Sequence, residues 1–130
     1  MVRAVDIEAE LANLSVLDGR SRDTPPEAQN NAFATLAEFG SGGVSVGSFV
    51  GDSPWERHRQ GDELVHILKG RAVVTILHES GETELELSAG MLTVVPQGLW
   101  HRFHAPNGVT VLTVTPYPTD HSAADDPRQE

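Results

Sequence analysis

The chain has 130 residues, a length typical of one domain, and its 19 acidic and 9 basic side chains give a formal net charge of −10. Such a charge repels phosphate backbones and anionic lipid, so the composition argues against nucleic acid and membrane surfaces as partners. The chain has no cysteine, which excludes disulfides and thiolate metal sites. It shows neither a signal-peptide pattern nor an apolar run of about 18 residues, so we expect a cytoplasmic protein whose partners are small molecules.

Residues 1–30 are predicted to form an arm in front of the main domain. Apolar residues at positions 4, 7, 11 and 14 repeat with helical spacing, which predicts a helix over residues 4–17. A helix this short is marginal alone, so it must pack on the domain or on a second subunit. Residues 18–31 are rich in turn formers and contain Pro25-Pro26, so we expect no regular element there.

A β pattern dominates the chain from residue 31 onward. Apolar or alternating stretches bounded by turn residues predict about eight strands, at residues 32–39, 44–50, 63–68, 72–77, 84–87, 91–95, 99–104 and 109–115. Lys69-Gly70-Arg71 predicts a tight turn that would join the third and fourth of these strands as a hairpin. The pattern is typical of an all-β sandwich or barrel, here over residues 31–118, followed by an acidic flexible tail at 119–130.

Residues 55–70 place titratable side chains where they can converge. Alternate residues of an extended chain share a face, so Glu56 and His58 can point at one site. Glu63 begins a predicted strand whose other residues on the same face are valine and isoleucine. A glutamate on an apolar inward face is costly unless it is paired or bound to a metal, so Glu63 is the strongest single indication of a site.

A second stretch, residues 90–101, supplies another imidazole. His101 follows a Pro-x-Gly turn and shares its face with Phe103. Two imidazoles with one or two carboxylates form a ligand set that suits a divalent transition metal. The sequence therefore predicts a metal site at His58, Glu63 and His101, with Glu56 as a fourth candidate ligand. The ion would be iron, manganese, nickel or zinc, and its open coordination positions would accept water or a substrate oxygen.

Both stretches resemble the two sequence motifs of the cupin superfamily. The first motif is Gly-x5-His-x-His-x4-Glu-x6-Gly and the second is Gly-x5-Pro-x-Gly-x2-His-x3-Asn; the matching residues are His58, Glu63, Gly70, Gly90, Pro96, Gly98 and His101. The resemblance implies a double-stranded β-helix, a small jelly roll, over roughly residues 31–118. Three positions depart from the family pattern: the opening glycine of the first motif is displaced by one, to Gly51, Glu56 stands at the first histidine, and Ala105 stands at the closing asparagine.

Several residues have a second interpretation. Glu56 could be a surface carboxylate paired with Arg57 or Arg59, and the other three residues could form a metal-free, hydrogen-bonded pocket. Histidines outside the site are expected to face away from it or to lie in solvent; they are His66, His78, His104 and His121. Trp55 and Trp100 flank the two motifs and are expected to pack in the core or in an interface.

Two functions fit this interpretation. The first is a metal-dependent enzyme that acts on a small polar molecule, and the resemblance permits dioxygenase, isomerase or lyase chemistry. In that enzyme Glu56, if it is not a ligand, would be the catalytic general base. The second is a non-catalytic domain that binds or senses a small molecule. A homodimer is also predicted, because strand-rich domains with arms often pair through the arm or a sheet edge.

Overall fold

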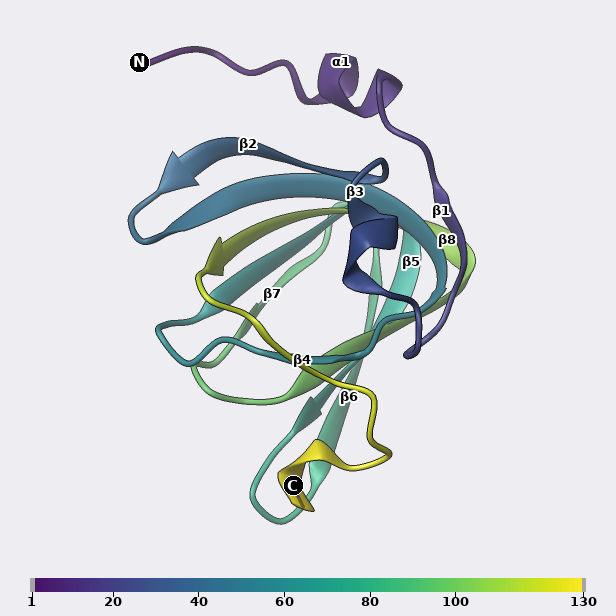
Figure 1. The fold of residues 1–130 in the computed structure, drawn as a ribbon, viewed down its shortest axis with the longest axis vertical. Coiled ribbons are helices and arrows are strands. Elements are labelled where there is room, and N and C mark those ends of the chain that lie inside the picture. The colour runs from purple at the N-terminus through teal and green to yellow at the C-terminus, as the bar shows by residue number, and fades with distance from the viewer. Residues whose placement is uncertain (1, 130) are drawn as a thin grey trace.

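In the computed structural model, which describes residues 2–129, the chain forms a curled sheet with short helices near both ends (Figure 1). The N-terminal elements are α1 (Ile7–Ala12), β1 (Leu17–Arg20) and the 3-10 helix η1 (Pro26–Gln29). The remaining strands are β2 (Phe33–Phe39), β3 (Gly42–Asp52), β4 (Trp55–Arg57), β5 (Glu63–Leu77), β6 (Glu82–Ser88), β7 (Leu92–Val95), β8 (His101–Pro116) and β9 (Asp120–Ser122), followed by the 3-10 helix η2 (Pro127–Gln129). The predicted all-β class with a short N-terminal helix is confirmed.

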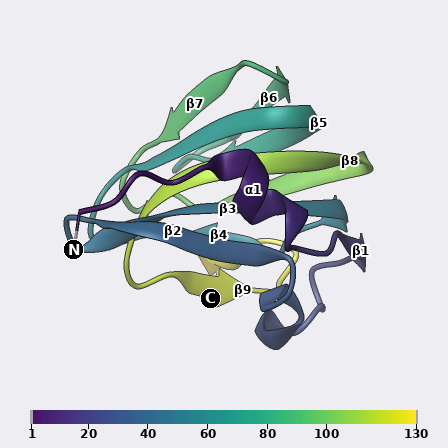
Figure 2. The same cartoon turned by 90° about the horizontal axis from the view of Figure 1, so that it is seen from above.

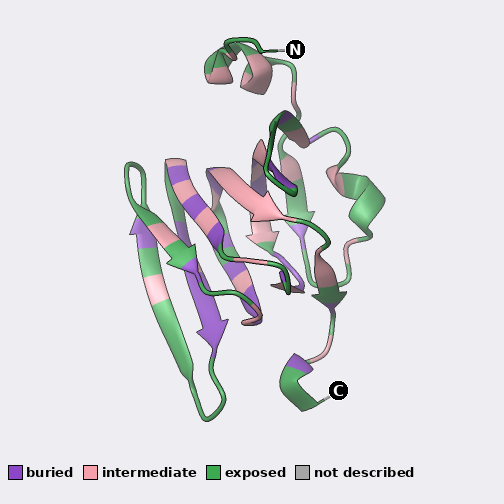
Figure 3. Cartoon of the chain, turned by 90° about the vertical axis from the view of Figure 1, so that its left-hand side faces the viewer, coloured by how far each residue is buried: buried purple, intermediate pink, exposed green. Residues whose placement is uncertain are grey.

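Two long antiparallel strands, β5 and β8, organise the sheet (Figure 2). The first part of β5 also pairs with β7, and its second part pairs with β6. On its other edge β8 pairs with β3 and β4. Because successive side chains of a strand point to opposite faces, buried and half-buried residues alternate along the first part of β5 (Figure 3). The inward residues, such as Val65, Ile67, Val74 and Val111, form the main hydrophobic core.

The predicted turn at residues 69–71 is wrong, because β5 runs through it without reversing. Gly70 has a positive φ of 74°, and the register with β8 shifts on both sides of it. A Cβ atom at Gly70 would lie 2.3 Å from the carbonyl oxygen of Gly108, so only glycine fits this close approach. The glycine signal marks an irregularity within one strand, not a hairpin. The predicted strands at 99–104 and 109–115 likewise belong to one strand, β8.

The two terminal segments are more ordered than the sequence indicated. Helix α1 is shorter than predicted and begins after Asp6, whose carboxylate accepts a hydrogen bond from the Ala9 amide at 3.1 Å. Strand β1 follows, parallel to β3, where no regular element was expected. Strand β9 pairs with β4 inside the segment predicted to be a flexible tail. The division of the chain into arm, barrel and tail stays a prediction, but β1 and β9 both belong to the sheet.

The two tryptophans lie in a second buried cluster, as predicted. Trp55 and Trp100 pack together with Leu77. The guanidinium carbon of Arg102 lies 4.3 Å from the centroid of the Trp55 ring, and that of Arg57 lies 4.4 Å from the centroid of Trp100. Each arginine therefore covers one tryptophan face through a cation–π contact.

Candidate metal centre

Three of the four predicted ligands come together inside the barrel. His58 follows β4, Glu63 is the first residue of β5 and His101 is the first residue of β8. Their exposed fractions are 3%, 5% and 1%, so all three side chains are buried. The three residues lie on separate elements, and both β4 and β5 pair with β8 in the curled sheet.

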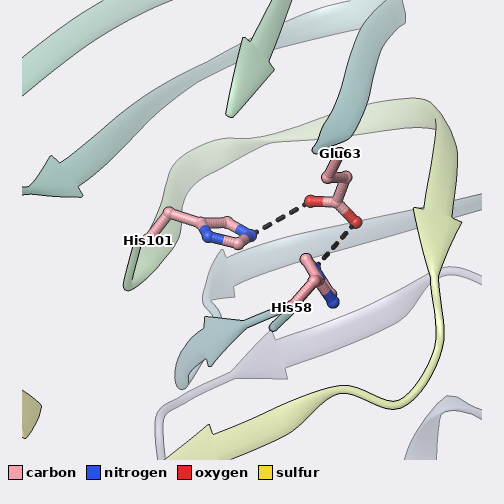
Figure 4. Close-up of side chains that lie close together, drawn as sticks. All are labelled: His58, Glu63 and His101. Carbon is pink, nitrogen blue, oxygen red and sulfur yellow. Dashed lines mark hydrogen bonds and ion pairs between the residues drawn. The ribbon is translucent and has the colours of Figure 1, made fainter. Parts of the chain in front are cut away.

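Glu63 lies between the two imidazoles (Figure 4). Its Oε1 is 3.0 Å from Nε2 of His101, and its Oε2 is 3.1 Å from Nε2 of His58. One potential ligand atom from each residue lies within 4.8 Å of the others. This spacing would let one ion contact all three side chains.

Neighbouring groups orient each of these side chains. Nδ1 of His101 lies 3.0 Å from the carbonyl oxygen of Leu99, and since a carbonyl only accepts, Nδ1 carries the hydrogen. Oγ1 of Thr119 lies 3.0 Å from Nδ1 of His58. The Thr115 hydroxyl donates to Oε2 of Glu63 at 2.6 Å. Such second contacts fix the tautomer of a histidine and direct its other nitrogen toward a metal.

Burial and charge pairing set opposite pKa shifts in the cluster. Burial alone would raise the pKa of the Glu63 carboxyl, but the bond from His101 and the nearness of both imidazoles lower it to about 2. Burial alone would lower the pKa of the His101 imidazole, but the Glu63 carboxylate raises it. The carboxylate is therefore ionised, and without a metal the His101 imidazolium is favoured as its partner.

The donor set fits a divalent transition metal. Nε2 of His58 is buried and lies 3.1 Å from Oε2 of Glu63, but this contact lacks hydrogen-bond geometry, so the lone pair of Nε2 is available to the cluster when Nδ1 carries the hydrogen. Two imidazoles and one carboxylate suit iron, manganese, nickel or zinc. Three protein ligands would also leave positions free for a substrate, as in catalytic sites.

Glu56, the fourth predicted ligand, stands apart from this cluster. It pairs in register with His101 across β4 and β8, but the group that could hold a metal contains only the other three residues. Its carboxylate oxygens lie 3.9 Å from a guanidinium nitrogen of Arg20 and 3.9 Å from Nε2 of His121. The alternative partners Arg57 and Arg59 contact Asp120 instead. A role of Glu56 as ligand or general base stays a prediction.

A pocket of about 470 Å³ borders the cluster through Glu63. Its lining residues are Arg20, Pro26, Gln29, Asn30, Phe33, Thr35, Ser45, Phe49, Glu56, Glu63, Phe103, Val111, Thr113, Thr115, Tyr117, Thr119 and His121. Sequence reasoning missed Arg20, because β1 lies in a turn-rich stretch without periodic signal. His121 is exposed as predicted, with 39% of its side chain accessible, but it also borders the pocket, which the sequence did not indicate.

The other histidines follow the sequence interpretation more closely. His66 lies on β5 at a half-buried position that alternates with the buried, inward residues. His104 is exposed on β8 and bonds to Asp52. His78 bonds to Thr83 at the surface, at 2.7 Å.

A curled β-sheet that encloses a His/Glu cluster beside a pocket defines a barrel protein with a potential metal site. The family described as "Cupin domain" matches residues 50–115, and the chain therefore belongs to the cupin family. The predicted jelly-roll fold is confirmed by similar solved structures. No match was found among curated proteins.

Three solved structures illustrate this likeness. A cupin-2 domain protein from Shewanella frigidimarina is 17% identical with a TM-score of 0.60, and the match covers 87% of this chain and 94% of that one. A hydroquinone 1,2-dioxygenase, in complex with Cd²⁺ and 4-hydroxybenzonitrile, is 20% identical with a TM-score of 0.55, over 65% and 63% of the two chains. An oxalate decarboxylase of Bacillus subtilis with Mn(II) centres is 14% identical with a TM-score of 0.58, over 68% and 26%. At these identities the likeness shows the fold.

Within residues 2–129, none of the helices has the length and apolar character needed to cross a membrane.

Proposed function

We propose that the protein is a metal-dependent enzyme that acts on a small polar molecule held in the pocket beside Glu63. His58, Glu63 and His101 would hold one divalent ion, which would be iron, manganese, nickel or zinc. The observation that carries this proposal is the buried cluster itself, in which the two oxygens of Glu63 lie 3.1 Å from Nε2 of His58 and 3.0 Å from Nε2 of His101. When bound, such an ion supplies Lewis-acid or redox chemistry.

The residues around the cluster have distinct parts in this proposal. Leu99 and Thr119 hold the two imidazoles in orientation, and Thr115 does the same for the Glu63 carboxylate. Glu56 borders the same pocket and is the proposed general base, because a carboxylate beside the substrate can accept a proton. Dioxygenase, isomerase and lyase chemistry are all compatible with this arrangement.

The first test is elemental analysis of untagged protein purified without chelators. We expect one ion per chain in the wild type and in His104→Ala, and its loss in His101→Ala. His104 is the matched control because it lies on the same strand with its side chain exposed. A wild type that takes up no metal after addition of Fe²⁺, Mn²⁺, Ni²⁺ or Zn²⁺ would contradict the proposal.

The second test asks whether a bound ion keeps a free position, as an enzyme requires. Protein loaded with Mn²⁺ should enhance the relaxation of water protons, because water exchanges at positions that protein ligands leave open. A loaded protein that leaves water relaxation unchanged would indicate a closed, structural site, and the enzyme proposal would then fail.

One observation favours a second function, a metal-free binding or sensing module. Glu63 already has partners in His101 and Thr115, so its buried charge is compensated without an ion. In that case chelator-treated protein would bind its small ligand as tightly as untreated protein does.

We further propose that the protein is a cytoplasmic homodimer. Two observations support the dimer. Met91, Leu92 and Val94 are apolar and exposed on or beside β7. Among the described strands, β7 pairs only with β5. A monomeric mass in sedimentation at micromolar protein would contradict the dimer.

A further inference from the structure

Arg20 is a buried charge in the wall of the pocket. The residue is 6% exposed and lies at the end of β1, which pairs with β3. Strand β1 precedes the residues that the family model matches. Its register partner is Gly51, which has a positive φ of 118°. A Cβ atom on Gly51 would lie 2.1 Å from the Arg20 carbonyl oxygen, so this glycine permits the close approach that places Arg20.

One nitrogen of the Arg20 guanidinium is left without a hydrogen bond by the described residues. Its Nε is buried and has no hydrogen-bond partner among residues 2–129. The carboxylate that contacts it, that of Glu56, lies 3.9 Å from a terminal nitrogen, which is too far for a hydrogen bond. Burial lowers the pKa of Arg20 even though Glu56 opposes this shift. A buried guanidinium nitrogen without a hydrogen bond is unfavourable unless another group completes it.

Two phenyl rings hold the guanidinium in place. Its central carbon lies 4.5 Å from the centroid of the Phe49 ring and 5.6 Å from that of Phe33. Contacts with ring faces engage the flat side of a guanidinium and leave its N–H edge available. That edge is the part that binds a carboxylate through two parallel hydrogen bonds.

The rest of the pocket indicates the class of ligand. Hydroxyl groups gather on the wall, from Thr35, Ser45, Thr113, Thr115, Tyr117 and Thr119. With a divalent ion bound, the charges of the ion, Arg20 and the two lining glutamates leave one net positive charge. A monocarboxylate neutralises that charge, whereas a doubly charged phosphate would exceed it.

We propose that Arg20 binds the carboxylate of a small organic acid, whose other polar atoms contact the hydroxyl-rich wall. This inference rests on the proposed function in one respect, since it names the substrate class of the same pocket. The binding itself depends on Arg20 and can be measured with or without a metal.

The test is calorimetric titration of chelator-treated and of Zn²⁺-loaded protein. The probes are acetate, lactate and benzoate, each compared with its neutral amide, and inorganic phosphate. The variants are Arg20→Met, Arg20→Lys and Arg102→Met. Arg102 is the matched control because it also covers an aromatic ring, that of Trp55, but lies outside the lining of this pocket.

We expect at least one acid to bind the wild type and Arg102→Met more tightly than its amide does. Arg20→Met should weaken that binding by about tenfold or more, because a charge-assisted pair of hydrogen bonds is lost. The affinity of Arg20→Lys for the acid should lie between those of the wild type and Arg20→Met, since lysine keeps the charge but not the planar fork. Thermal unfolding checks that Arg20→Met is folded, and Arg20→Lys carries the comparison if it is not.

The inference is overturned if no acid binds better than its amide, if both Arg20 variants bind like the wild type, or if phosphate binds more tightly than every acid. Failure of the metal proposal gives a different result. Carboxylate binding that depends on Arg20 without metal uptake would leave a metal-free pocket for organic acids. Metal uptake with no effect of Arg20 would leave the metal centre without this substrate class.

Discussion

The metal-ligand candidates and Arg20 border one pocket but differ in how the protein satisfies them. In the cluster, His101 bonds to Glu63 and to the Leu99 carbonyl, and Thr115 adds another bond to the glutamate. Arg20, supplied by β1, has a buried Nε that no described residue completes. The barrel thus contains a charge-compensated cluster, whereas the terminal strand supplies a charge that we propose a ligand completes.

The largest expected effect concerns the cluster of metal-ligand candidates. Glu63→Gln keeps the shape of the side chain but removes the ligand charge, so metal affinity should fall by about 100-fold or more. Calorimetric metal titration would measure it, with Glu84→Gln, exposed on β6, as the control. Unchanged affinity in Glu63→Gln would exclude Glu63 as a ligand.

The next effect concerns pH in chelator-treated protein. The folded pKa of Glu63 is about 2, below its ordinary value of 4.5, so its contribution is present above pH 4.5 and is lost as pH falls toward 2. The folded pKa of His101 is raised above 6.5, so its contribution is present below pH 6.5 and is lost as pH rises through the folded pKa.

The unfolding free energy of the wild type should therefore exceed that of Glu63→Gln most clearly between pH 4.5 and pH 6.5. The Glu63 share of that difference is on the order of 3 kcal/mol. Urea unfolding across the pH range measures it. A difference that does not vary with pH would mean that the two groups are not paired in this way.

A substitution at Gly51, the register partner of Arg20 on β3, tests how Arg20 is placed. Gly51→Ala combines an unfavourable backbone conformation with a clash against Arg20, so unfolding free energy should fall by about 2 kcal/mol. Carboxylate binding should be lost while metal uptake remains. Gly90→Ala is the control, because its φ of 91° is also positive but the added Cβ meets open space, and about 1 kcal/mol is expected there. Intact carboxylate binding in Gly51→Ala would contradict the placement of Arg20 by this glycine.

The smallest effect joins the two regions. Thr119, between the barrel and β9, contacts Nδ1 of His58, so Thr119→Val should weaken metal binding about tenfold. Thr83→Val is a matched control because Thr83 contacts another imidazole, that of His78, at the surface. Equal metal affinity in the two variants would show that His58 needs no orientation from Thr119.

The sequence was sufficient to predict that Glu63 and His101 belong to one buried cluster. Glu63 at the start of an apolar strand face, and His101 after a Pro-x-Gly turn, are local signals that do not depend on knowing which strands pair. Of the four predicted ligands, however, only His58, Glu63 and His101 lie together in the structure. Alternation placed Glu56 and His58 on one face, but Glu56 instead lies near Arg20 and His121, two residues on strands that were not predicted.

The sequence was not sufficient where non-local pairing decides the structure. Strand β1 pairs in parallel with β3, far along the chain, and no turn or periodic pattern specifies that register. Gly70 gave a clear turn signal, but the partner strand β8 accepts it as an irregularity within β5. A glycine with positive φ allows either outcome, and only the neighbouring strand selects one of them.

The pairing of β5 with β8 also has a consequence for folding kinetics. Leu64 pairs with Val114 and Ile76 with His101, so the two strands join residues that are far apart in the chain. Topologies dominated by such contacts fold slowly, in about milliseconds to seconds. Glu63 borders one end of this register and His101 lies at the other, so their side chains meet only when the whole sheet has curled. A bound ion should therefore slow the unfolding of the finished barrel and leave its rate of assembly almost unchanged.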